Sequence, residues 1–65
     1  MNISEAKKYL NKTVKYKNKQ HNIDGEYILT GCIIRKGEKE FYYEAELKDK
    51  KANSLIYTGI ENIKV

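Results

Sequence analysis

Residues 26–48 read EYILTGCIIR-KGEKE-FYYEAELK, and this stretch decides the fold of the chain. Two runs rich in β-branched and aromatic residues, 26–35 and 41–48, flank a short charged segment, which is typical of a β-hairpin. The Gly37-Glu38 pair suits a type II′ turn, because that turn takes glycine at its first central position. With this turn, the predicted facing pairs are Ile34 with Phe41, Cys32 with Tyr43, Thr30 with Ala45 and Ile28 with Leu47.

The predicted hairpin has two faces of different character, since side chains alternate along a strand. The four facing pairs share one face, which is almost wholly apolar and is therefore predicted to be core. The opposite face carries Tyr27, Leu29 and Ile33 from the first strand and Tyr42 from the second. These residues need cover from a helix, another strand or a partner, and Tyr27, Leu29 and Ile33 are predicted interface residues. Gly31 lies mid-strand, where a glycine indicates a bulge or bend.

The flanking segments predict a small, mainly β domain. We expect a short helix over residues 3–10, a strand over 13–17, a polar turn over 18–25 and a charged loop over 49–53. A strand over 54–58 follows, then a 3₁₀ turn over 60–63 and a last short strand or tail at 64–65. About five strands with a glycine-bent central one favour an SH3-like small barrel with an N-terminal helix, as one domain over residues 1–65. An OB-type barrel usually needs more residues.

The composition limits how such a domain is stabilised. A chain of 65 residues has a thin stability margin, and its single cysteine allows no internal disulfide. No Cys/His cluster suggests a structural metal, so self-association is the remaining device and a homo-oligomer is possible. No apolar run approaches the roughly 20 residues that span a bilayer. A lone cysteine and no export signal predict a cytoplasmic protein that does not insert into a membrane.

The positive charge is concentrated in the first third of the chain. The net charge is +4, yet residues 1–20 contain six lysines against Glu5 alone. Such asymmetry favours an anionic partner. A lysine-rich surface that binds only water is the alternative, and the sequence leaves it open.

The chain lacks the side chains that a catalytic centre needs. A nucleophile requires a base and an orienting group, and the one Cys–His combination is Cys32 with His21. Cys32 is predicted to face inward and His21 to lie on a distant loop. No nucleotide-binding fingerprint or cofactor motif is present. We therefore predict a protein that is not an enzyme and uses no cofactor.

The residues predicted to bind a ligand combine positive charge with aromatic rings. Lysines meet phosphates, while tyrosines can stack on bases. The predicted set comprises Lys12, Lys15, Lys17, Lys19 and Arg35 for charge, with Tyr16 and Tyr42 for stacking. The alternative is that most of the six tyrosines are ordinary strand aromatics.

The hairpin sequence, together with ISEAKK at residues 3–8 and IENI at residues 60–63, resembles short proteins encoded by phages or mobile elements of Gram-positive bacteria. Such proteins often resemble inhibitors of host defence. This resemblance implies an accessory or anti-defence protein that takes up a nucleotide signal or blocks a host protein. It assigns no functional residues.

Three functions are consistent with these patterns. The first is a non-catalytic protein that binds an anionic nucleotide-type ligand. The second is a DNA- or RNA-binding barrel that uses the same residues. The third is a protein-interaction module that blocks a host protein through its uncovered apolar residues.

Overall fold

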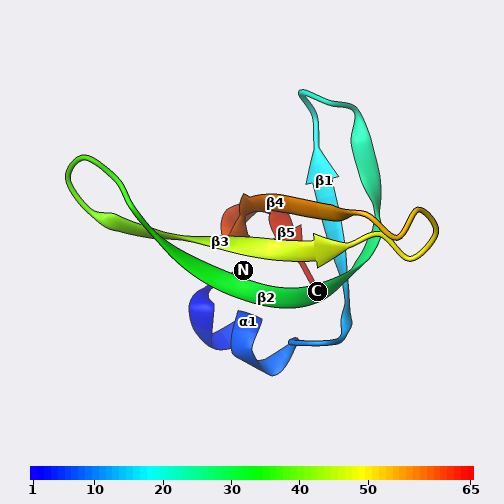
Figure 1. Ribbon diagram of the computed structural model, residues 1–65, viewed down its shortest axis with the longest axis horizontal. Coiled ribbons are helices and arrows are strands. Elements are labelled where there is room, and N and C mark those ends of the chain that lie inside the picture. Colours follow the sequence, from blue (N-terminus) through cyan, green and yellow to red (C-terminus); the bar gives the residue numbers. More distant parts are fainter.

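The computed structural model describes all 65 residues, and its five strands form one antiparallel sheet in the order β4-β3-β2-β1-β5 (Figure 1). The predicted mainly β fold with an N-terminal helix is confirmed. Strands β4 and β5 are the two edges of the sheet, so closure into an SH3-like barrel stays a prediction. The elements are α1 (Ile3–Lys8), β1 (Thr13–Asn18), β2 (Ile23–Lys36), β3 (Phe41–Lys48), β4 (Leu55–Gly59), the 3₁₀ helix η1 (Ile60–Asn62) and β5 (Ile63–Lys64).

The capping residues of α1 fix where the chain begins its first helix. The Asn2 side chain accepts a hydrogen bond from the Glu5 N–H at 2.9 Å, and Glu5 Oε1 accepts one from the Asn2 N–H at 3.2 Å. This reciprocal pair satisfies two helix-end donors. The helix is shorter than predicted, and it buries Ala6 against the sheet.

The turn between β1 and β2 lies earlier than the sequence indicated. Asp24 and Gly25 were predicted to form a turn, but both belong to β2 and pair with Lys17 and Tyr16. The chain reverses at residues 19–22 instead, where Asn22 adopts a left-handed backbone conformation with φ of 53°. Asparagine tolerates that conformation better than most residues, so it takes the place predicted for glycine.

The predicted register of the β2–β3 hairpin is wrong by two residues in its outer part. Lys36 pairs with Phe41, so the loop contains four residues, Gly37 to Glu40, and is closed by a hydrogen bond from the Gly37 N–H to the Glu40 carbonyl at 2.8 Å. Because the loop is two residues longer than the predicted turn, each residue in this outer part of β2 pairs with a residue of β3 two positions beyond the predicted one. Ile34 therefore faces Tyr43 and Cys32 faces Ala45.

A β-bulge at Thr30 then changes which side of β2 faces the core. The register shifts between Leu29 and Gly31, and Leu29 pairs with Leu47. An extra residue moves the following side chains to the other face. The prediction that Ile28 and Thr30 are core residues and that Leu29 lies on the uncovered face is therefore wrong. Leu29 is completely buried, whereas the predicted bend near Gly31 is confirmed.

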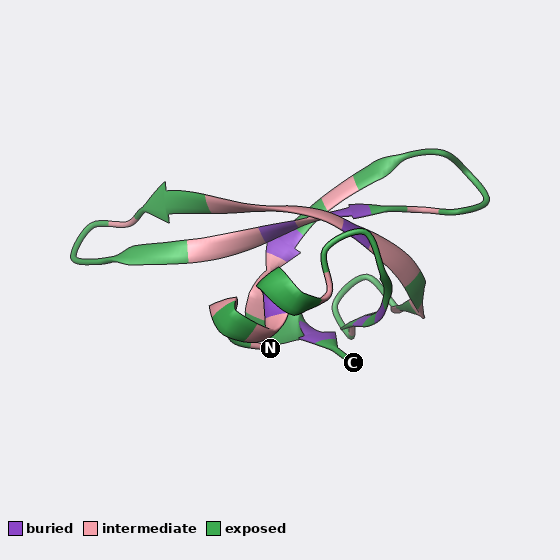
Figure 2. Ribbon diagram, turned by 90° about the horizontal axis from the view of Figure 1, so that it is seen from below, coloured by how far each residue is buried: buried purple, intermediate pink, exposed green.

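The core lies where the strands cross near the middle of the molecule (Figure 2). Its largest fully buried side chains are Leu29, Leu47, Ile63 and Val14. Tyr16 is also buried, and its ring contacts the Tyr27 ring edge-to-face with centroids 5.7 Å apart. Only eight of the 65 residues are buried, so each of these contacts matters to the stability of the domain.

The far end of the β2–β3 hairpin extends beyond this core and is exposed (Figures 1 and 2). Ile34 and Phe41 were predicted to be core residues, but they are 60% and 69% exposed. They do lie on the core side of the hairpin, in line with Leu29 and Leu47. Nothing covers them because the rest of the sheet does not reach that far.

The structure contains no helix with the length and apolar character that a membrane-spanning helix requires.

Glu46 joins three strands on the solvent side of the sheet. Its carboxylate accepts hydrogen bonds from the Thr30 hydroxyl on β2 at 2.8 Å and from the Tyr57 hydroxyl on β4 at 2.8 Å. The hydrogen bond from Tyr57, and next that from Thr30, lower the pKa of Glu46. The same contact with Glu46 raises the pKa of Tyr57.

These pKa shifts predict a loss of stability at both ends of the pH scale. A lowered carboxyl pKa stabilises the fold above its unfolded value, and that contribution disappears as acid protonates Glu46. A raised phenol pKa stabilises the fold below its unfolded value, and that contribution disappears as alkali ionises Tyr57. We expect the urea midpoint to fall as the pH drops below the usual pKa range of a carboxyl group and as it rises above the usual pKa range of a phenol.

Two variants separate these contributions from the other titrating groups. Tyr57→Phe removes the hydroxyl that donates to Glu46 and should reduce the fall of the urea midpoint in alkali. Glu46→Gln removes the carboxylate and should reduce the fall of the urea midpoint in acid. An acid profile of Glu46→Gln that is parallel to that of the original protein would contradict this role of Glu46.

Candidate functional site: a lysine groove

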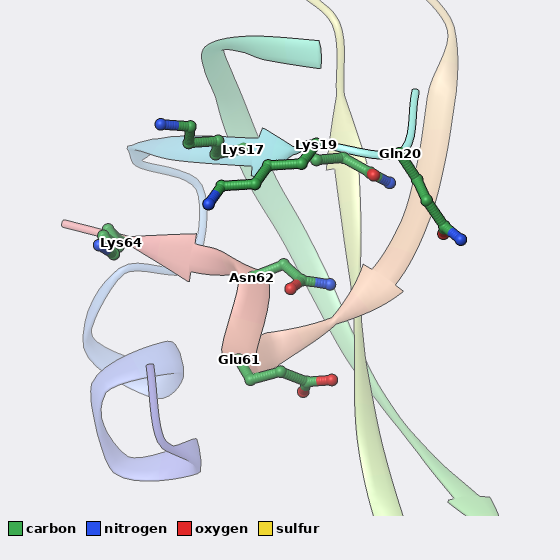
Figure 3. A pocket seen from close by; sticks show the side chains of 7 residues that line it. Lys17, Lys19, Gln20, Glu61, Asn62 and Lys64 are labelled. Atoms are coloured by element: carbon green, nitrogen blue, oxygen red, sulfur yellow. The ribbon is translucent and has the colours of Figure 1, made fainter. Parts of the chain in front are cut away.

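A shallow groove of about 430 Å³ lies between the end of β1, the turn after it, and the η1–β5 segment (Figure 3). None of its lining residues is hydrophobic. A second depression continues it along the outer side of β1 and shares Lys17, Asn62 and Lys64 with it. We call the two together the lysine groove, and it is lined by Lys15, Lys17, Asn18, Lys19, Gln20, Asp24, Glu61, Asn62 and Lys64.

Strand alternation explains why the lysines gather on this surface. Val14 and Tyr16 point into the core, so Lys15 and Lys17 must point outward. On the neighbouring strand Ile63 is buried and Lys64 is exposed for the same reason. Lys15 lies directly opposite Lys64 in the β1–β5 ladder, which brings residues from the two ends of the chain together.

The core beneath the groove holds its polar side chains in place. The Tyr16 hydroxyl accepts a hydrogen bond from Asn18 Nδ2 at 2.9 Å, and Asn18 Oδ1 accepts one from the His21 N–H at 3.3 Å. On the other wall, Asn62 Nδ2 donates to the Thr58 hydroxyl at 3.0 Å. Both asparagines are thereby oriented by contacts that a ligand does not have to supply.

The lysines of the groove are not neutralised by ion pairs. The one ion pair of the structure joins Arg35 to Glu44 on the hairpin, with 2.7 Å between Arg35 Nε and Glu44 Oε1. Two carboxylates line the groove, those of Asp24 and Glu61, against four ammonium groups. The groove therefore has a positive balance and open donors, as a phosphate site requires.

The structure brings together three of the five cations that the sequence predicted. Lys15, Lys17 and Lys19 line the groove. Lys12 lies in the segment between α1 and β1, with its ammonium 5.9 Å from the centre of the Tyr9 ring. Arg35 lies on the projecting hairpin and is engaged by Glu44. Neither of these two residues lines the groove.

The predicted stacking residues do not line the groove. Tyr16 is only 3% exposed, so its ring offers no face to a ligand, and the prediction that it stacks on a base is wrong. Tyr16 lies on the same face of β1 as the buried Val14, so strand alternation turns its ring toward the core and away from the lysines. Tyr42 is exposed, but it pairs with Arg35 on the hairpin.

The predicted apolar interface is largely covered. Leu29 is in the core, Tyr27 packs against the core and Tyr16, and Ile33 is half-buried opposite Glu44. The apolar surface lies instead on the other side of the hairpin. Ile34, Tyr43 and Cys32 form a depression of about 500 Å³ there, together with Ile3 and Leu10 near α1. Partial burial raises the pKa of the Cys32 thiol.

Lys64, Asn62 and Gln20 are site residues that sequence reasoning missed. The signal for Lys64 was its place after Ile63, because an apolar residue beside a charged one indicates a strand with one buried face. Its neighbour strand was not evident from the sequence, since the pairing of β5 with β1 joins residues nearly fifty positions apart.

In comparisons with known proteins, no family model, no curated protein and no solved structure matches the chain. The resemblance to proteins of phages and mobile elements therefore stays a prediction. The function must be argued from the groove itself.

The facing lysines predict a gain in stability when one of them is reversed in charge. Like charges directly opposite in an antiparallel pair are destabilising. We expect Lys64→Glu to stabilise the protein by about 0.2–1 kcal/mol at low salt, because it would face Lys15. Urea unfolding measures this change. Lys19→Glu is the matched control, since Lys19 lies in the turn and has no facing lysine. An equal effect of both variants would contradict a specific Lys15–Lys64 repulsion.

Proposed function

We propose that this protein is a non-catalytic domain that binds the phosphate backbone of a double-stranded nucleic acid through the lysine groove. The observation that carries the proposal is the convergence of Lys15, Lys17, Lys19 and Lys64 on a groove that no hydrophobic residue lines. Each phosphate contact made by a lysine releases counterions, and this release supplies the binding free energy.

The absence of an aromatic surface in the groove favours a duplex over a free nucleotide or a single strand. Sites for single-stranded nucleic acids stack bases on aromatic side chains. Only polar and charged residues line the groove, and Tyr16 is buried below it. Backbone phosphates need only donors and positive charge, which the groove provides. Binding through phosphates alone is independent of sequence.

The like-charge pair supports the same proposal. Facing Lys15 and Lys64 lowers the stability of the free protein, and a phosphate between them would offset the repulsion. We also propose that the protein is an accessory protein of a phage or mobile element, as its sequence resemblance implies. The anti-defence role would then act on nucleic acid rather than on a nucleotide signal.

Salt dependence is the most direct test of this function. With four lysine–phosphate contacts, the logarithm of the affinity for a duplex should fall with the logarithm of salt with a slope of about −3.6. Fluorescence anisotropy with a labelled duplex measures it. Lys17→Ala and Lys64→Ala should each reduce the slope by about 0.9 and weaken binding at every sequence tested.

Lys12→Ala and Arg35→Ala are the matched controls, because they remove a cation outside the groove. They should leave the slope unchanged. No binding of any duplex at low salt would overturn the proposal. A rise in melting temperature with a free nucleotide, lost in Lys17→Ala, would overturn it in favour of a nucleotide-binding site.

A further inference from the structure

The two edges of the sheet differ in how they are protected against pairing with another strand. Strand β5 is two residues long and carries Lys64, and both features discourage strand addition. Strand β4 is five residues long and contains no charged residue or proline. It lies within residues 52–60, the longest run of the chain without a charged residue. Unprotected edges of this kind pair with other strands.

The ladder between β3 and β4 determines which backbone groups of β4 are free. The Asp49 N–H donates to the Ser54 carbonyl at 2.9 Å, just beyond the Lys48–Leu55 pair. Antiparallel ladders alternate between hydrogen-bonded and non-hydrogen-bonded pairs. Leu55, Tyr57 and Gly59 are therefore in non-hydrogen-bonded pairs with β3. Their N–H and C=O groups point toward the open edge.

We propose that two copies of this chain associate through their β4 strands, which pair antiparallel about a two-fold axis at Tyr57 and form a continuous ten-stranded sheet. Tyr57 of each copy faces Tyr57 of the other, and Leu55 faces the partner's Gly59. The backbone groups of Leu55, Tyr57 and Gly59 that point toward the open edge thus form the hydrogen bonds between the two β4 strands. The dimer closes the assembly, because it leaves only the two short β5 edges free.

The side chains beside β4 are complementary to those of a second copy in this arrangement. Lys48 lies next to Leu55, and Glu44 lies next to Gly59, both on the solvent side of β3. The Glu61 carboxylate also lies over Gly59. The two-fold pairing therefore directs the Lys48 ammonium of one copy toward the partner's Glu61, whereas Glu44 lies one strand farther away and is engaged by Arg35. This happens twice, once on each side of the axis.

The exposed apolar side chains of β4 also gain cover. Leu55 and Tyr57 are 53% and 49% exposed. Leu55 would lie opposite the partner's Gly59, beside the Glu61 side chain that covers that glycine. The two Tyr57 residues would face each other across the two-fold axis, each with its ring directed toward its own β3 strand. Tyr57 is held toward β3 by its hydrogen bond to Glu46, which leaves the edge open.

Sedimentation velocity across a concentration series tests the dimer directly. We expect the mass to rise from monomer to dimer and no further. The variant Leu55→Glu should raise the dissociation constant at least tenfold. In the monomer the new carboxylate faces Lys48 and is tolerated, whereas in the dimer it lies near the partner's Glu61. Circular dichroism checks that the variant is folded.

Ile34→Glu is the matched control, since it places the same charge on the exposed apolar face of the hairpin. It should leave the dimer intact. A protein that remains monomeric at the highest concentration would overturn the proposal. Dissociation by Ile34→Glu and not by Leu55→Glu would also overturn it and would assign the contact to the hairpin.

A charge exchange keeps the test independent of folding defects. Lys48→Glu should weaken the dimer, and the double variant Lys48→Glu/Glu61→Lys should restore it. Loss of the dimer in the single variant without recovery in the double variant would contradict the proposed alignment. Amides of Leu55, Tyr57 and Gly59 should exchange more slowly as concentration rises. Unchanged exchange would contradict edge pairing.

Discussion

The β-bulge at Thr30 is the constraint on which the rest of the structure depends. One extra residue in β2 turns Leu29 toward Leu47, and these two side chains are fully buried. Without the extra residue, Ile28 would take the inner place and Leu29 would face water. The Thr30 hydroxyl holds the bulge to β3 through the Glu46 carbonyl at 3.1 Å and the Glu46 carboxylate at 2.8 Å. Glu46 then connects the same point to β4 through Tyr57.

The core that the bulge organises also positions the lysine groove. Tyr16 and Ile63 pair across β1 and β5 beside the buried leucines, and their outward neighbours are Lys15, Lys17 and Lys64. The groove therefore lies on the solvent side of β1 and β5, whose core side carries Tyr16 and Ile63. Burial of Tyr16 removes a possible stacking ring, and it also anchors Asn18 through the tyrosine hydroxyl. The same packing explains the charge of the site and its lack of aromatic lining.

Much of this fold was accessible from sequence because its signals are local. The predicted strand over residues 13–17 and the predicted 3₁₀ turn after Gly59 are both present, whereas the predicted polar turn is shorter and lies at residues 19–22. The hairpin register was not accessible, because the loop contains four residues where a two-residue turn was predicted, and the bulge is held by a contact between Thr30 and Glu46, 16 positions apart. Strand alternation alone places Lys15 and Lys17 on the same side of β1, but Lys64 joins them only through the long-range β1–β5 pairing.

The central claim is that the bulge places Leu29, and not Ile28, in the core. Urea unfolding of Leu29→Ala and Ile28→Ala tests it, because a regular hairpin and a bulged one assign opposite roles to these neighbours. We expect Leu29→Ala to lower the free energy of unfolding by about 2–5 kcal/mol, the cost of a cavity in a packed core. Ile28→Ala should cost clearly less, since Ile28 is half-buried on the solvent side opposite Lys48. A larger loss for Ile28→Ala than for Leu29→Ala would contradict the bulge and the account built on it.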